Sequence, residues 1–119
     1  MKVAIIGASD DPSRFSYKAF RSLMSYGHDV YLVSPKYQQI GEHKVYKTIA
    51  ELPSGVETFT MYVNKRISSQ LEEEILRYSP KRVIFNPGAE NSDLKKKIED
   101  QQIQAVDSCT LVMLRAGSF

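Results

Sequence analysis

Residues 2–20 read KVAIIGASDDPSRFSYKAF, and the order of residue types in this stretch predicts the local fold. The apolar run Val3–Ile6 has the length of a buried strand, and a turn rich in Gly, Ser and Asp follows it. The turn contains four residues of types that cap helix starts: Ser9, Asp10, Ser13 and Ser16. Because free amides at a helix start can hold an anion, the stretch predicts a strand, a turn and a capped helix able to bind a phosphate.

Strand-like and helix-like segments alternate along the rest of the chain. Further apolar runs of strand length are Val30–Val33, Phe59–Val63, Val83–Phe85 and Ile103–Val106. Apolar residues at helical spacing predict helices around 20–27, 67–78 and 92–101. We expect Gly27 to end the first helix in the left-handed conformation, and Ser69 with Glu72 to form a capping box in the second.

Strands that alternate with helices favour a parallel sheet joined by right-handed crossovers. We therefore predict an α/β fold, a Rossmann-like, doubly wound, five-stranded parallel sheet with helices on both faces. Between Lys36 and Val56 the pattern loosens into a loop, in which KVY predicts an extended piece and TIAEL one or two helical turns. No repeat or linker divides the chain, so we expect residues 1–119 to form one domain.

The amino-acid composition gives no sign of nucleic-acid binding, membrane insertion or secretion. The 119 residues include 16 Lys+Arg and 14 Asp+Glu, so the net charge of +2 indicates neither a nucleic-acid-binding nor a membrane-binding surface. No stretch approaches the roughly 18 apolar residues of a membrane span, and the N-terminal apolar run is too short for a signal peptide. The single cysteine, Cys109, excludes an internal disulfide and indicates a cytoplasmic protein.

Ligands of doubly wound sheets bind at the carboxyl ends of the strands, near the point where strand order reverses. The dinucleotide motif G-x-G-x-x-G is absent after the first strand. The second strand is followed by Ser34, Pro35 and Lys36, where a NAD site usually has an acidic residue. A cation there suits a phosphorylated ribose, as in NADP or coenzyme A, although a solvated lysine in a plain turn fits equally.

The turns after the third and fourth expected strands are also candidates. Val63, Asn64 and Lys65 lie at the end of the third strand, and Asn86, Pro87 and Gly88 follow the fourth. The Asn-Pro-Gly turn is rigid and has a small residue where a ligand can approach the backbone. A connection without any ligand explains both turns as well.

No set of residues indicates catalysis or a metal site. His28 and His43 fall in polar segments without a spaced partner, so we expect both on the surface. Glu90 is a single carboxylate and therefore no acid–base pair. Cys109 fits a small buried side chain at a helix start, and a mixed disulfide with a thiol ligand is the alternative interpretation.

The order and spacing of these segments resemble the small CoA-binding proteins of the CoA-binding domain family, which are similar to the N-terminal domain of the succinyl-CoA synthetase alpha subunit. The resemblance spans nearly the whole chain, through VAIIGAS, PSRFSYKAF, VSPK, IGEHKVYKTIAELP, FNPGAENSD and VDSCTLV. It implies that coenzyme A or an acyl-CoA binds at the carboxyl ends of the parallel strands, without being transformed by this chain.

The resemblance also implies site residues. The pyrophosphate region would meet the first turn and the residues after it: Gly7, Ala8, Ser9, Ser13, Arg14, Ser16 and Tyr17. The adenosine end would meet Ser34, Pro35 and Lys36, with Ser in place of the family's Asn. The remainder of the groove would be lined by Val63, Asn64, Asn86, Pro87 and Gly88.

Three alternatives stay open. The ligase alpha subunit that the chain resembles has a second domain with a phosphorylated histidine, so a detached acyl-CoA ligase subunit would need a separate partner. An NADP-dependent reductase and an interaction or regulatory module without ligand are the others. A homodimer or a complex with another protein is equally open.

Overall fold

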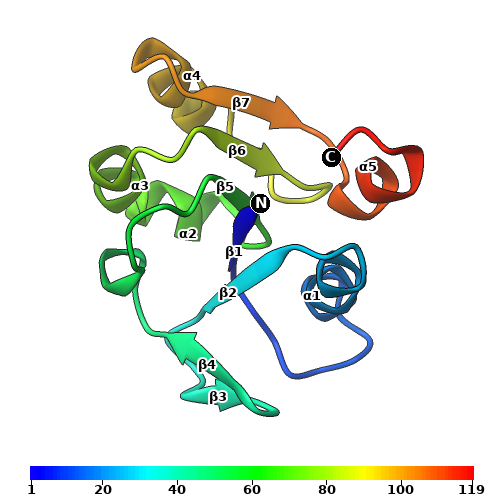
Figure 1. The fold of residues 1–119 in the computed structure, drawn as a ribbon. Coiled ribbons are helices and arrows are strands. Elements are labelled where there is room, and N and C mark those ends of the chain that lie inside the picture. Colours follow the sequence, from blue (N-terminus) through cyan, green and yellow to red (C-terminus); the bar gives the residue numbers. More distant parts are fainter.

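The apolar run at the N-terminus forms the central strand, β1 (Lys2–Ile6). In the computed structural model, which describes residues 1–119, β1 pairs in parallel with β2 (Asp29–Val33) and with β5 (Thr58–Met61) (Figure 1). The parallel sheet continues through β6 (Arg82–Phe85) and β7 (Gln104–Asp107). The predicted α/β class and the five parallel strands are therefore confirmed.

The sheet has seven strands and not five, because the loop after β2 adds two. The KVY segment lies in β4 (His43–Tyr46), which pairs in parallel with β2, and β3 (Gln39–Ile40) pairs antiparallel with β4. The strand order is β3-β4-β2-β1-β5-β6-β7. A two-residue strand is too short to show periodicity in sequence. The TIAEL segment contains the predicted short helical turn, the 3-10 helix η1 (Ile49–Glu51).

Helices cover both faces of the sheet (Figure 1). One face carries α1 (Phe15–Ser25) and α5 (Thr110–Ala116), whereas the other carries α2 (Lys65–Gln70), α3 (Glu72–Tyr78) and α4 (Ser92–Asp100). The structure contains no helix that combines the length and the apolar character needed to cross a membrane.

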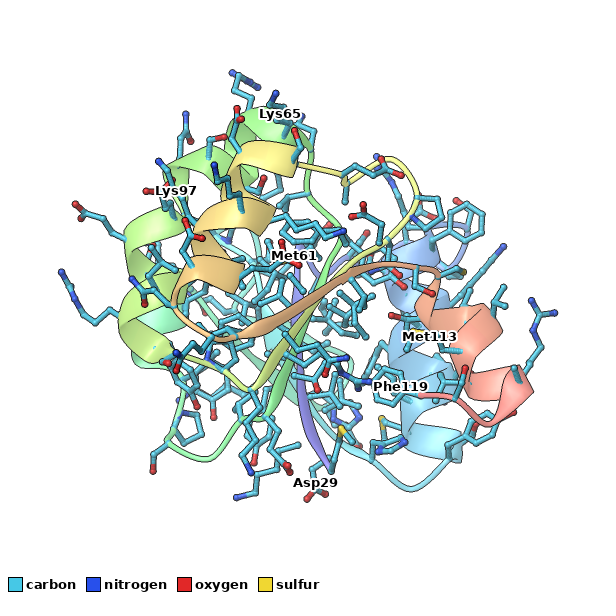
Figure 2. The ribbon with its side chains drawn as sticks, turned by 90° about the horizontal axis from the view of Figure 1, so that it is seen from above. Asp29, Met61, Lys65, Lys97, Met113 and Phe119 are labelled. Atoms are coloured by element: carbon cyan, nitrogen blue, oxygen red, sulfur yellow. The ribbon has the colours of Figure 1, made fainter.

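The strand β1 shows why both faces are covered. Val3 and Ile5 belong to the apolar cluster under α1 and α5, and Ala4 and Ile6 belong to the cluster under α3 and α4. All four are at most 1% exposed, as expected for a parallel strand buried on both sides. Figure 2 shows Met61 of β5 between the two helix layers.

Helix boundaries follow the prediction in part. Gly27 lies just beyond α1 with a φ of +85°, as predicted, and α4 begins at the predicted residue. The predicted capping box of Ser69 and Glu72 was wrong, because the predicted helix is interrupted at Leu71 and its first part, α2, starts at Lys65. The N-cap of α2 is Asn64, whose side chain accepts a hydrogen bond from the Ile67 amide. The Ser69 hydroxyl instead accepts a hydrogen bond from Nδ2 of Asn91.

The chain path defines the point where strand order reverses. From β1 the chain crosses to β2 on one side of the sheet, and after β4 it returns to β5 on the other side of β1. The carboxyl ends of β1, β2 and β5 therefore meet at one place, where ligands of such sheets bind.

Candidate ligand-binding site

Two adjoining cavities lie along the carboxyl ends of the strands. The first, which we call the β1–β2 cavity, has a volume of about 510 Å³ and is lined by Gly7, Ala8, Ser9, Arg14, Phe15, Ser16, Ser34, Pro35, Lys36, Tyr37, Tyr62, Val63, Asn64 and Ile67. The second, the β5–β6 cavity, has a volume of about 260 Å³ and is lined by Phe15, Tyr62, Val63, Asn64, Asn86, Pro87, Gly88, Ala89, Cys109 and Leu111. Because four residues line both, the cavities form one groove.

The groove brings together thirteen of the fifteen residues expected to bind a ligand. Ser13 and Tyr17 lie outside it. The hydroxyl and the amide of Ser13 both donate hydrogen bonds to the Asp11 carboxylate. Tyr17 lines a separate hollow beside the β3–β4 hairpin, where its ring packs edge-on against Phe20.

Gly7 allows two strand ends to approach each other. Its φ is +98°, and a Cβ at this position would lie 2.8 Å from Cγ1 of Val63 and 2.9 Å from the carbonyl oxygen of Tyr62. The amides of Gly7 and Ala8 both donate to the carbonyl oxygen of Val33 at 3.0 Å. The first two residues of the turn therefore bond β1 to β2 through their backbones, and the missing side chain of Gly7 leaves room for the chain after β5.

The start of α1 differs from the sequence-based expectation, because no side chain caps it. Ser9 Oγ accepts from the amide of Asp11, whose carboxylate is bonded to Ser13, and Ser16 is buried. The hydrogen bonds from the amide and hydroxyl of Ser13 also lower the pKa of the Asp11 carboxyl. Of the predicted caps, Ser9 and Ser13 thus stabilise the turn itself.

The uncapped start of α1 leaves backbone amides free to bind a ligand. The first amides of α1 have no intrahelical acceptor, and its first turn contains no acidic residue. The N-cap position is Arg14, whose side chain is exposed at the β1–β2 cavity. Free amides, the positive end of the helix dipole and a guanidinium together suit an anion such as a phosphate.

The turn after β2 is held rigidly. Ser34 is 3% exposed; its hydroxyl accepts from the Lys36 amide at 3.1 Å, and its own amide donates to the Tyr46 carbonyl at 2.9 Å. The Ser34 side chain therefore shapes the turn, and Lys36 lies exposed on it.

A third cavity, which we call the lysine cavity, adjoins the β1–β2 cavity at Pro35, Lys36 and Tyr37. It has a volume of about 460 Å³ and is lined by Pro35, Lys36, Tyr37, Gln38, Lys44, Val45, Lys47 and Glu51. Three lysines against one glutamate make this end of the groove cationic.

The side chain of Asn86 is committed to bonds inside the protein. Its Nδ2 donates to Thr60 Oγ1 at 2.7 Å and to the Met61 carbonyl at 2.9 Å, and its Oδ1 accepts from the Thr110 amide at 2.9 Å. Asn86 is 2% exposed, so it lines the cavity as a buried support for the turn after β6 and for the start of α5.

The sequence analysis did not identify several residues of the groove, chiefly Phe15, Tyr62 and Leu111. Phe15 is the first residue of α1 and 66% exposed, and Leu111 lies in the seven-residue α5, which is too short to show a clear helical stripe. Burial raises the pKa of Tyr62 to about 12, so its hydroxyl stays protonated even at moderately alkaline pH. Cys109 is half-buried at the start of α5, on the wall of the β5–β6 cavity.

A larger hollow of about 770 Å³ lies at the opposite edge of the sheet, between the amino ends of β5 and β6 and the end of α3. Its walls include Glu57, Glu74 and Tyr78. Arg77 and Lys81 also line this hollow, so its charges balance, whereas the groove at the carboxyl ends has two cationic lining residues and no acidic one. Parallel sheets also bind ligands at the carboxyl ends of their strands. The groove at the carboxyl ends is therefore the better candidate.

Comparison with known proteins relates the chain to ligase subunits. It is 32% identical over 125 residues to the subunit alpha of ADP-forming acetate–CoA ligase I of Pyrococcus furiosus, covering 98% of this chain and 27% of that protein. A second match, to the corresponding alpha subunit of ligase II, has 35% identity over 69 residues and covers 15% of that protein. The chain thus spans about a quarter or less of these relatives.

Solved structures of similar size share the fold. A crystal structure of an uncharacterized protein superposes with a TM-score of 0.94 at 37% identity, covering 99% of this chain and 97% of that chain. A hypothetical protein from Pyrococcus horikoshii gives a TM-score of 0.89 at 26% identity and covers 97% and 82%, respectively.

The family match agrees with the groove. Residues 1–115, which include every residue that lines the two cavities, match the family described as CoA binding domain. The chain therefore belongs to the CoA-binding domain family, and its cofactor is coenzyme A.

Proposed function

We propose that the groove binds coenzyme A or an acyl-CoA in one defined direction. The pyrophosphate would lie at the start of α1, the phosphorylated adenosine would point to the lysine cavity, and the pantetheine arm would run toward the β5–β6 cavity. The observation that carries this proposal is the uncapped start of α1 beside Arg14, which opens between a cationic cavity and an uncharged one.

The charge distribution supports this direction. The 3′-phosphate of coenzyme A is a phosphate monoester, which carries a charge of about −1.5 to −2 at neutral pH. Lys36, Lys44 and Lys47 line the lysine cavity, whereas no charged side chain lines the β5–β6 cavity. The more highly charged end of the ligand therefore fits the lysine cavity, and the pantetheine arm fits the other end.

We propose binding without chemistry by this chain. Asn86 is bonded internally, the Tyr62 hydroxyl is held protonated, and Cys109 faces the groove without a histidine among the lining residues. Such a set supplies no base to activate a nucleophile. We also place the protein in the cytoplasm, in agreement with its single, unpaired cysteine.

Calorimetric titration tests the proposal. We expect micromolar binding of coenzyme A, weaker binding of dephospho-CoA, and no heat with NAD or NADP. Binding of NADP but not of coenzyme A would replace the proposal with a reductase, and hydride transfer would then be assayed. Absence of heat with all four ligands would contradict it and favour a module that acts through its surface.

The similarity to ligase alpha subunits supports a second function, in which the chain presents bound coenzyme A to a separate catalytic partner. The purified chain is then expected to form no acyl-CoA from ATP, acetate and coenzyme A by itself. Turnover by the chain alone would contradict both the non-catalytic function and the need for a partner.

A further inference from the structure

The β5–β6 cavity differs from the rest of the groove in having no charged lining residue. Its walls contain no Asp, Glu, Lys, Arg or His, and six of its ten residues are hydrophobic. The adjoining β1–β2 cavity, in contrast, includes Arg14 and Lys36. A charged group that entered the β5–β6 cavity would lose water without gaining a counter-ion.

Several hydrogen-bonding groups on these walls are already bonded within the protein. Asn86 uses both Nδ2 and Oδ1 in internal hydrogen bonds, and Oδ1 of Asn64 accepts from the Ile67 amide at 2.9 Å. The amide of Ala89 donates to the carbonyl oxygen of Asn86 at 2.8 Å. These groups are bonded within the protein, and no lining residue supplies a cation to pair with a carboxylate.

A negative charge lies next to one lining residue of the cavity, Gly88. The Glu90 carboxylate accepts a hydrogen bond of 3.0 Å from the amide of Gly88, which lines the cavity. This bond occupies a second backbone donor of the turn and fixes the carboxylate beside Gly88. A ligand that ends in a carboxylate would meet repulsion there, whereas an uncharged chain would not.

The size and the apolar walls of the β5–β6 cavity fit a short acyl chain. The volume of about 260 Å³ equals that of eight or nine water molecules at roughly 30 Å³ each, which is enough for the thiol end of a cofactor with a short chain attached. Phe15 stands 66% exposed at the junction of the two cavities, and Leu111 forms part of the wall. A short alkyl chain would cover both side chains.

We propose that the β5–β6 cavity is an acyl subsite, which selects thioesters of coenzyme A with short, uncharged acyl groups over those with dicarboxylic acyl groups. Leu111 and Phe15 supply the apolar contacts, and the absence of a cation excludes the second carboxylate. This inference rests on the proposed binding of coenzyme A in the groove.

A ligand series tests the inference on the intact protein. Dissociation constants are measured by calorimetry for coenzyme A, acetyl-CoA, butyryl-CoA and succinyl-CoA. We expect butyryl-CoA to bind at least as tightly as coenzyme A, and succinyl-CoA to bind at least tenfold more weakly than butyryl-CoA. Equal affinity for butyryl-CoA and succinyl-CoA would overturn the inference, as would tenfold weaker binding of every acyl-CoA than of coenzyme A.

A charge introduced into the wall provides the sharper test. Leu111→Lys places a cation in the cavity from a half-buried position at the start of α5, where a long side chain can keep its ammonium group hydrated. We expect the ratio of the succinyl-CoA to the butyryl-CoA dissociation constant to fall at least tenfold. The matched control is Val112→Lys, because Val112 is the next residue of the same helix, 51% exposed, and lines neither cavity.

The outcomes separate the two proposals. A circular dichroism spectrum and an unfolding midpoint like those of the wild-type protein show that Leu111→Lys is folded, so a ratio that stays constant in this variant would overturn the acyl subsite alone. If the wild-type protein binds butyryl-CoA and succinyl-CoA alike but still binds coenzyme A, the proposed function stands and the acyl subsite falls. If it binds no form of coenzyme A, both fall.

Discussion

Oδ1 of Asn86 accepts a hydrogen bond of 2.9 Å from the backbone amide of Thr110, which ties the turn after β6 to the first residue of α5. The two residues are 24 positions apart in sequence. Thr110 Oγ1 lies 2.8 Å from Thr60 Oγ1, to which Asn86 also donates. This buried network sets the position of α5, and hence of Cys109 and Leu111 on the cavity wall.

Replacing Asn86 with Ala is expected to lower the free energy of unfolding by about 3 kcal/mol, since a buried group left without a partner costs about 1–3 kcal/mol. The substitution orphans the Thr110 amide and the Met61 carbonyl. Urea unfolding measures the loss. Gln101→Ala, at an exposed residue beyond α4, is the control and is expected to change stability by less than about 0.5 kcal/mol. A near-neutral Asn86→Ala would contradict the structural role.

Gly7→Ala is expected to lower the free energy of unfolding by about 3 kcal/mol, because a left-handed backbone costs about 1–2 kcal/mol and the added methyl group would overlap Val63. Gly41→Ala is a matched comparison, since Gly41 has a φ of +61° and no heavy atom within 4 Å of the added Cβ. It should cost only the backbone part, about 1 kcal/mol. Equal losses in denaturant melts would show that the contact with Val63 has no effect.

Lys36→Glu tests the orientation of the ligand. We expect coenzyme A to bind at least about tenfold more weakly, which corresponds to about 1.4 kcal/mol, and dephospho-CoA to lose less. The difference should shrink at high salt, because Lys36 is exposed. Lys96→Glu, on the exposed side of α4, serves as the control. Equal losses for both ligands would place the 3′-phosphate elsewhere.

Arg14→Ala tests the pyrophosphate position and should give a different pattern. Because both coenzyme A and dephospho-CoA contain the pyrophosphate, we expect both to weaken by a similar factor, about tenfold, since hydrogen bonds to charged groups contribute about 1.5–3 kcal/mol. Arg115→Ala, in the last turn of α5, should leave both affinities unchanged. A loss confined to coenzyme A would assign Arg14 to the 3′-phosphate instead.

From the raised pKa of Tyr62 we predict how the free energy of unfolding changes at alkaline pH. Burial raises the pKa of Tyr62 from 10.0 to about 12, so the folded state favours the protonated hydroxyl. The resulting stabilisation is fully present below pH 10 and is lost as the pH rises through 12. The wild-type protein should therefore lose about 2 kcal/mol more than Tyr62→Phe between pH 9.5 and 12, by the linkage of about 1.4 kcal/mol per pKa unit. Parallel curves of unfolding free energy against pH would refute this.

Local residue patterns were sufficient to predict much of the fold. The run Val3–Ile6 is apolar at every position, which a strand requires when both of its faces are covered, and the structure places it at the centre of the sheet. Gly27 marked the end of α1 because a left-handed residue follows many helices. The β3–β4 hairpin was missed as paired strands, since Gln39–Ile40 is too short for a periodic signal.

For the candidate site, too, the sequence was enough to predict one part and not the other. The turns after the strands could be located in sequence, because the carboxyl ends of parallel strands gather at one edge. The roles of their side chains could not: Ser9 and Ser13 were expected to cap α1, yet they bond within the turn and leave the helix start free. Whether a polar side chain faces a ligand or a neighbouring backbone depends on contacts between distant segments.

The five parallel strands, the turns at their carboxyl ends and the cation at Lys36 are properties of short stretches of residues, so the sequence alone was enough to predict them. The contact of Gly7 with Val63, the bond from Thr110 to Asn86 and the meeting of Phe15 with Leu111 at one cavity exist only in the folded chain. They join segments that are tens of residues apart, and their free energies depend on burial and packing that no local pattern contains.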